Sequence, residues 1–148
     1  MLRASRYVAP LIATLLLAAC SGTTSPSAAS GTTVEVTLQE FSVLLDSATA
    51  PAGSITFTVT NTGPEDVHEF VIVKTDLDPG DLPVDEEGAV TEDAEGMEVI
   101  NEIEDIAVDA TQELTVTLDA GSYVLICNIV EDGEVHYAQG MRTAFTVE

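Results

Sequence analysis

The chain has few basic residues. Its 148 residues include 4 Lys and Arg against 26 Asp and Glu, a formal net charge of −22 at pH 7. Nucleic-acid binding depends on basic side chains that contact phosphates, so this balance excludes it. Direct adsorption to anionic lipid is disfavoured for the same reason. The acidity has two interpretations: it steers a basic partner toward the protein, or it is a general adaptation to salty surroundings.

The front of the chain lacks an apolar run long enough to span a membrane. Arg3 and Arg6 precede a short apolar stretch from Pro10 to Ala19, the pattern of a signal peptide over residues 1–19. Removal of this peptide leaves Lys74 and Arg142 as the cations of the mature protein. Residues 20–31 are rich in Ser, Thr, Gly, Ala and Pro, which predicts a flexible tether.

Cysteine is also scarce, with two in the chain. Leu17-Ala18-Ala19-Cys20 resembles a bacterial lipobox, which implies that Cys20 is lipidated and holds the protein outside the cytoplasmic membrane. The alternative is an ordinary signal peptide that leaves Cys20 as a free thiol. If Cys20 is the anchor, Cys127 has no disulfide partner, and an unpaired Cys in an exported protein needs an explanation. A buried, apolar role for Cys127 is one alternative.

Residues 32–148 have the length of one domain. Short runs with alternating or continuous apolar character, separated by Gly, Pro and Asp turns, predict an all-β Greek-key sandwich. The expected strands are Thr33–Leu38, Phe41–Leu45, Ser54–Asn61, Val67–Lys74, Gln112–Leu118, Ser122–Cys127 and Thr143–Val147.

Residues 75–110 interrupt this pattern with many acidic residues and weak apolar spacing. They predict a long acidic insertion loop that is mobile and dispensable for metal binding. Within them, Met97–Ile106 fits either an edge strand or a short helical turn.

The residues that carry chemistry gather near the end of the chain. Cys127, His136 and Met141 lie on either side of an acidic turn, and the second histidine, His68, begins another strand-like run. A thiolate, two imidazoles and a thioether form the ligand set of a blue-copper electron-transfer site. Zinc is disfavoured, because Met is a poor zinc ligand and there is one thiolate. A hydrolase is disfavoured because no oxyanion-hole signature accompanies Cys127.

Two spacings then give a resemblance that covers nearly all of residues 32–148. They are N-x-G-x-x-x-x-H at Asn61, Gly63 and His68, and C-x8-H-x4-M at Cys127, His136 and Met141. With them, the sequence is similar to cupredoxins, the small blue-copper proteins. The resemblance implies one type 1 copper held by His68, Cys127, His136 and Met141.

The chain also departs from relatives of that family. Ile126 and Asn128 flank the Cys, so the neighbouring His that serves a second copper in nitrite reductases is missing. Glu69 stands where many cupredoxins have an Asn that braces the ligand loop.

The sequence therefore predicts an extracytoplasmic, membrane-anchored electron carrier rather than an enzyme. The expected partner is a redox protein with a basic docking face, and the expected state is a monomer. The alternatives are a copper-binding or copper-delivery lipoprotein and a metal-free interaction domain.

Overall fold

The computed structural model describes residues 31–148. The predicted signal peptide, Cys20 and most of the predicted tether lie outside the described residues. No helix within residues 31–148 is long and apolar enough to cross a membrane. The elements in this part of the chain are β1 (Thr32–Gln39), β2 (Ser42–Leu45), β3 (Thr49–Ala50), β4 (Gly53–Asn61), β5 (His68–Lys74), β6 (Glu98–Ile106), β7 (Thr111–Leu118), β8 (Gly121–Ile126), β9 (Val130–Glu131), β10 (Glu134–Val135), α1 (His136–Gln139) and β11 (Arg142–Val147).

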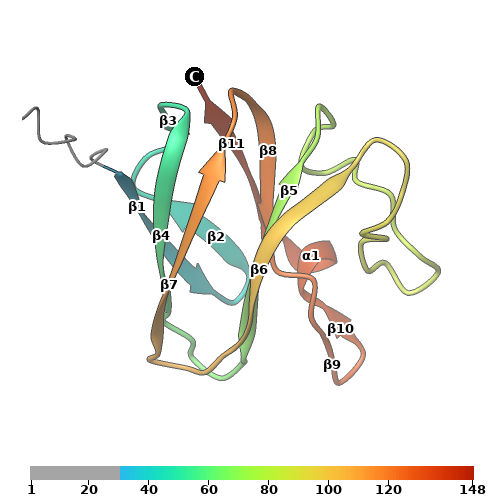
Figure 1. Cartoon of the computed structure of the whole chain (residues 1–148). Helices are drawn as coiled ribbons and strands as arrows, with labels where there is room; N and C mark the ends of the chain where they lie inside the picture. Colours follow the sequence, from blue (N-terminus) through green and yellow to red (C-terminus); the bar gives the residue numbers. More distant parts are fainter. Residues whose placement is uncertain (1–30) are drawn as a thin grey trace, which may run out of the picture.

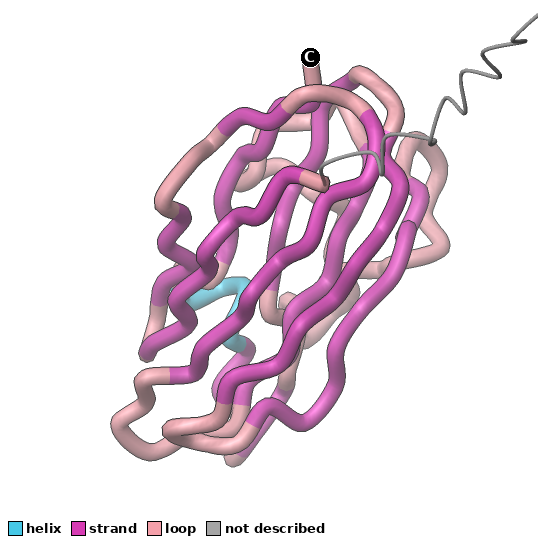
Figure 2. The backbone as a smooth tube through the Cα atoms, turned by 60° about the vertical axis from the view of Figure 1, so that its left-hand side comes forward, coloured by secondary structure: helices cyan, strands magenta, loops and turns pink. Residues whose placement is uncertain are grey.

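Two sheets form a sandwich, as Figures 1 and 2 show. One sheet has the order β2-β1-β4-β7, and the other has the order β3-β11-β8-β5-β6. The β4–β5, β6–β7 and β7–β8 connections cross between the sheets, and each sheet contains parallel and antiparallel pairs. The predicted all-β sandwich is confirmed, and all seven expected strands are present within one residue of their expected bounds.

The first core lies between the sheets. Strands β1 and β4 alternate buried and more exposed residues, so their period of two places one side-chain row inside. Phe57 of β4 packs its ring against Phe70 of β5 and Phe145 of β11, with ring centroids 5.3 and 5.4 Å apart. These aromatic contacts join the two layers.

A second core covers the outer face of the five-stranded sheet. Strands β5 and β8 are continuous apolar runs because both of their faces are buried. The second face consists of Val71, Val73, Val124 and Ile126. Its cover comes from residues outside these two sheets, namely Leu82, Val90, Val135 and Tyr137.

The prediction of a loop over residues 75–110 is therefore only partly correct. Residues 98–106 form β6, the edge strand paired with β5, which resolves the choice between strand and helical turn. Residues 75–97, called the acidic segment from here on, contain one isolated bridge between Val84 and Val90. Leu82 and Val90 are 4% and 6% exposed. The expected lack of packing is therefore wrong for Leu82 and Val90, which are buried in the second core. The mobility of the segment and its dispensability for metal binding stay predictions.

Candidate metal centre

Strand pairing brings His68 and Cys127 to the same end of the five-stranded sheet. His68 is the first residue of β5, and Cys127 directly follows β8. The two strands are antiparallel neighbours with Val71 opposite Ile126, so the start of β5 lies beside the end of β8. Register in a β-ladder is fixed by which faces are buried, so these two positions are held by the core.

The chain then returns to supply His136. A β9–β10 hairpin turns through Asp132 and Gly133, both with positive φ. The backbone N–H of His136 donates to the Ile129 carbonyl at 2.9 Å and closes the hairpin. His136 opens α1, a short helix at a position where the sequence predicted a loop.

Three donor atoms meet at this point, and all three residues are at most 1% exposed. The Nδ1 atoms of His68 and His136 are 3.2 Å apart. The Cys127 Sγ atom lies 3.4 Å from Nδ1 of His136 and 3.9 Å from Nδ1 of His68. A point equidistant from three atoms at these separations lies about 2 Å from each, close to a metal–imidazole bond length. The three donors fit a single metal ion, and their softness suits copper.

The backbone of Met141 is hydrogen-bonded to two of the three donor residues, Cys127 and His136. It is fully buried, in the same core as Cys127. Its carbonyl accepts the Cys127 N–H at 3.1 Å, and its N–H donates to the His136 carbonyl at 3.0 Å. These bonds join the backbones of Cys127, His136 and Met141 within residues 127–141, which are called the ligand loop from here on. The side chain's role as a fourth ligand stays a prediction.

Gly140 allows Met141 to be placed there. Its φ is +131°, and an added Cβ would lie 3.0 Å from the Phe41 carbonyl oxygen. A residue with a side chain would clash with that carbonyl in a strained backbone conformation.

The protonation of the donors follows from their burial. Burial raises the pKa of the Cys127 thiol to about 11, although backbone N–H groups of Glu69 and Ile129 oppose this shift. The Glu69 N–H donates to Sγ at 3.4 Å. Burial also lowers the pKa of His68, and the neighbouring His136 lowers it further. His68 is therefore neutral and able to bind a metal near neutral pH, while the thiol must lose a proton to do so.

Acidic side chains face the outer edges of both imidazoles. The Nε2 atom of His68 lies 4.0 Å from Glu40 Oε1 and has no hydrogen-bond partner, and Nε2 of His136 lies 3.8 Å from Asp66 Oδ2. The Phe41 ring packs edge-on against His136, with centroids 5.3 Å apart. Burial tends to raise the pKa of Glu40, but hydrogen bonds from Asp66 and Glu65 N–H hold it below its usual value. No spacing in the sequence marks Glu40, Phe41 and Asp66, so their place at the site was not predicted.

The loop before His68 contains a turn that is held by side-chain hydrogen bonds. The Asn61 side chain is fully buried, donates to the carbonyls of Asp66 and Ile106 at 2.9 Å each, and accepts the Gly63 N–H at 2.8 Å. Gly63 has a φ of +60°, and an added Cβ would lie 2.8 Å from Val108. The N-x-G motif thus shapes the approach to the first ligand.

Glu69 does brace the ligand loop. Its Oε1 atom accepts the backbone N–H of Asn128, the residue after Cys127, at 2.7 Å. Burial raises the pKa of Glu69, and this hydrogen bond opposes the rise. Glu69 occupies the position where Asn was expected. Its side chain connects β5, which begins at His68, to the residue that follows Cys127.

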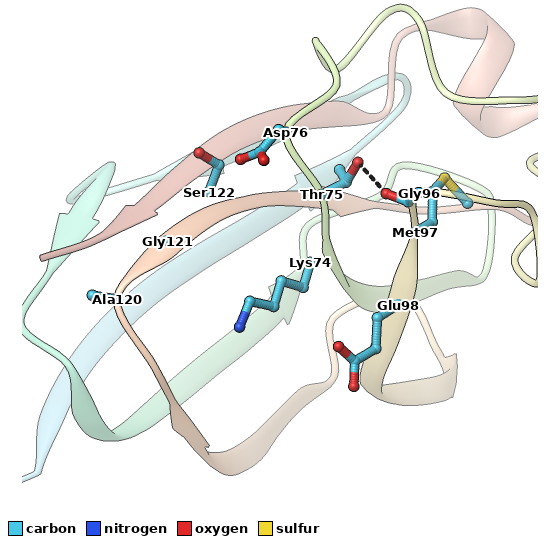
Figure 3. Close-up of a pocket in the computed structure, with 9 residues that line it drawn as sticks. All are labelled: Lys74, Thr75, Asp76, Gly96, Met97, Glu98, Ala120, Gly121 and Ser122. Carbon is cyan, nitrogen blue, oxygen red and sulfur yellow. Dashed lines mark hydrogen bonds between the residues drawn. The ribbon is translucent and has the colours of Figure 1, made fainter.

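A separate groove of about 460 Å³ lies at the opposite end of β5 (Figure 3). It is lined by Lys74, Thr75, Asp76, Gly96, Met97, Glu98, Ala120, Gly121 and Ser122. The Thr75 hydroxyl donates to the Gly96 carbonyl at 2.9 Å, and the Lys74 ammonium lies 5.9 Å from the centre of the Tyr123 ring. Lys74 ends the strand that His68 begins, so this groove is not part of the metal centre.

Comparisons with known proteins agree with this site. A search of curated proteins finds no match. The solved structures that match include reduced auracyanin from the photosynthetic bacterium Roseiflexus castenholzii, at 27% identity and a TM-score of 0.57, covering 80% of this chain and 98% of that one. Auracyanin A, a "blue" copper protein from Chloroflexus aurantiacus, has 20% identity and a TM-score of 0.51, covering 80% and 99%. An azurin from Methylomonas sp. strain J has 19% identity and a TM-score of 0.56, covering 79% and 98%.

The family comparison covers most of the chain. The model of the cupredoxin-like domain matches residues 9–136, which include His68, Cys127 and His136 and stop before Met141. One type 1 copper is the cofactor for which these donors are arranged. By this match, and by the buried His-Cys-His cluster at the end of a two-sheet sandwich, the chain belongs to the cupredoxin-like family.

Proposed function

We propose that this protein carries single electrons through a type 1 Cu(II)/Cu(I) centre held by His68, Cys127, His136 and Met141. The observation that carries the proposal is the set of three buried donors, 3.2 to 3.9 Å apart, at one end of the sandwich. Copper supplies the one-electron chemistry. The chain's own residues hold the donors in one arrangement, exclude water and direct the Glu69 N–H at the thiolate, so little has to move when the charge changes.

The decisive experiment is a visible absorption spectrum of the purified, copper-loaded protein. A thiolate-copper site should give an intense band at the red end of the spectrum and a blue colour. A colourless copper protein with the electron-spin signature of an ordinary tetragonal site would overturn the proposal.

The axial position has its own test. Met141→Leu should keep the blue colour and raise the reduction potential, because the long axial thioether tunes the metal while the short thiolate bond makes the colour. Cyclic voltammetry of the wild type and the variant measures the shift. Loss of copper binding in this variant would show that Met141 is not a weak axial ligand.

A copper-delivery protein is the alternative function. Delivery needs a site that exchanges its metal readily, whereas these three donors are buried and the sequence contains no Met-rich or His-rich tract. Copper transfer to a chelator that outpaces electron exchange with a redox partner would favour delivery over electron transfer.

We also propose a redox partner with a basic docking face. A cleft of about 490 Å³ beside the outer edges of the imidazoles is lined by Glu40, Phe41, Pro64, Glu65, Asp66, Glu131, Asp132 and Glu134. Its six carboxylates complement a basic surface, and Glu40 and Asp66 also approach the ligand imidazoles. The protein would act as a monomer and without enzymatic turnover.

The proposed location is outside the cytoplasmic membrane, with Cys20 acylated. The support is the Leu17-Ala18-Ala19-Cys20 motif and the Ser/Thr-rich tether that follows. Cys20→Ala in the native host should release the protein or leave it as an unprocessed precursor. Normal maturation to an anchored form would rule the lipobox out.

A further inference from the structure

The residues that directly follow the predicted ligands link the metal centre to the acidic segment. Glu69, Asn128, Tyr137 and Arg142 come one position after His68, Cys127, His136 and Met141. None of the four is a donor to the metal. Two of them, Asn128 and Tyr137, bind the acidic segment, and the other two contact these residues, Glu69 at Asn128 and Arg142 at Tyr137.

Asn128 binds the acidic segment with its whole amide group. Its Oδ1 accepts the Val90 N–H at 2.6 Å, and its Nδ2 donates to the Val90 carbonyl at 3.0 Å. Nδ2 also lies 3.1 Å from Glu92 Oε1. The side chain thus pairs with Val90 as a neighbouring strand would, while its backbone N–H is held by Glu69.

Tyr137 makes the second attachment. Its hydroxyl donates to the Pro79 carbonyl at 2.8 Å and accepts the Leu82 N–H at 3.3 Å. Its ring is buried with Leu82 and Val90 in the second core. Arg142 completes the layer, because its guanidinium lies 4.9 Å from the Tyr137 ring centre and donates to the Tyr137 carbonyl.

We infer that residues 79–92 of the acidic segment clasp the ligand loop, residues 127–141, and hold it in its metal-binding arrangement through Asn128 and Tyr137. The hairpin that precedes His136 has strands of two residues each, and Val135 is the one buried residue among these four. Such a loop samples many conformations unless something else fixes it. The clasp supplies that restraint beside two of the four predicted ligands, so Asn128 and Tyr137 are positioning residues.

The inference builds on the proposed copper site, but its test uses metal-free protein and so is independent of copper binding. Amide hydrogen exchange is measured at Cys127, His136 and Met141, whose N–H groups bond within the ligand loop and report its opening. The variants are Tyr137→Phe, which keeps the ring, and Asn128→Leu, which keeps the approximate shape. Tyr123→Phe is the matched control, because the Tyr123 hydroxyl donates to a backbone carbonyl, that of Asp119, at 2.9 Å near the other end of β8.

Each clasp variant should speed exchange at the three ligand-loop amides by about tenfold, since buried or partly buried hydrogen bonds are lost. Amides of the β4–β7 ladder should keep their wild-type rates, and Tyr123→Phe should leave the ligand loop unchanged. In copper-loaded protein, the same two variants should lose copper to EDTA faster than the control does.

Two results would overturn the inference. Faster exchange at Leu82 and Val90 with no change in the ligand loop would show that the acidic segment is held by the loop and does not hold it. Equal acceleration in the loop and in the β4–β7 ladder would show that the contacts stabilise the whole domain. If Asn128→Leu does not fold, Tyr137→Phe decides by itself, because only one oxygen atom is removed.

Discussion

The ligand loop and the acidic segment both lie outside the two main sheets and meet on the same face of β5 and β8. The spacing of Cys, His and Met in the ligand loop predicts metal binding from the sequence alone. The acidic segment has no chemical signature, and its many carboxylates suggest a solvated, mobile loop. Yet each is anchored by a few buried side chains, Val135 and Tyr137 in one and Leu82 and Val90 in the other. A high density of charge therefore does not prevent a segment from docking when it also has buried apolar residues and hydrogen bonds to its neighbours.

The strongest test of the ligand loop is Cys127→Ser. The fold should survive, but the thiolate-copper colour should vanish completely, because a hydroxyl does not replace the soft thiolate. Absorption and circular dichroism spectra measure the two effects separately. A blue Ser variant would mean that the colour arises elsewhere. Met141→Leu, which should stay blue, is the control for a change within the same loop.

Substitutions in the acidic segment should change the free energy of unfolding and leave the blue colour intact. Leu82→Ala removes a side chain that is 4% exposed and should lower the free energy of unfolding by about 2–4 kcal/mol. Leu77→Ala, in the same segment but 39% exposed, should change it by less than about 0.5 kcal/mol. Urea denaturation of the metal-free proteins gives both values. Equal, small effects would restore the interpretation of an unpacked loop.

Copper uptake should release a proton from the ligand loop. The pKa of Cys127 is raised to about 11, so the thiol is protonated near pH 8 and must ionise to bind copper. His68 adds no proton there, because its pKa is lowered. One proton per copper should appear in a weakly buffered indicator solution near pH 8, and apparent affinity should rise about tenfold per pH unit from there toward pH 11. Cys127→Ser should remove this proton, and a wild type that releases none would contradict the raised pKa.

The smallest expected effect separates local steering from general acidity. Glu131→Gln with Glu134→Gln neutralises two carboxylates of the cleft in the ligand loop. Glu86→Gln with Glu87→Gln makes the same charge change at exposed positions of the acidic segment. The cleft pair should slow electron exchange with a tripositive cobalt(III) complex a few-fold at low salt, and the segment pair should do so less.

The difference between the two pairs should fade as the Debye length falls to about 8 Å. The experiment starts from the reduced protein, and stopped-flow appearance of the blue colour, as the cobalt(III) complex oxidises the copper, measures the rates. Equal effects of the two pairs would mean that the acidity acts as a general surface property and does not steer a partner to the cleft.

Much of the fold followed from local patterns. Alternation in β1 and β4 and the Gly-containing turns predict strands because the period of two is a property of the backbone. The brief elements β3, β9, β10 and α1 were missed, since pieces of two to four residues carry too little pattern. The continuous apolar runs of β5 and β8 were a usable signal that both faces of the sheet need a cover. That signal does not say which segment supplies the cover, and the acidic composition of residues 75–97 gives no sign of their packing.

The sequence by itself determined the sandwich, the scarcity of cations and the donor types at His68, Cys127 and His136, because these follow from side-chain chemistry and short-range periodicity. Only the tertiary structure decided that Glu69 replaces the expected Asn brace, that Glu40 and Asp66 face the imidazoles, and that Asn128 and Tyr137 grip the acidic segment. Each of these is a contact between residues distant in sequence. Such contacts depend on strand register and on which faces are buried, and neither is encoded in any single stretch of the chain.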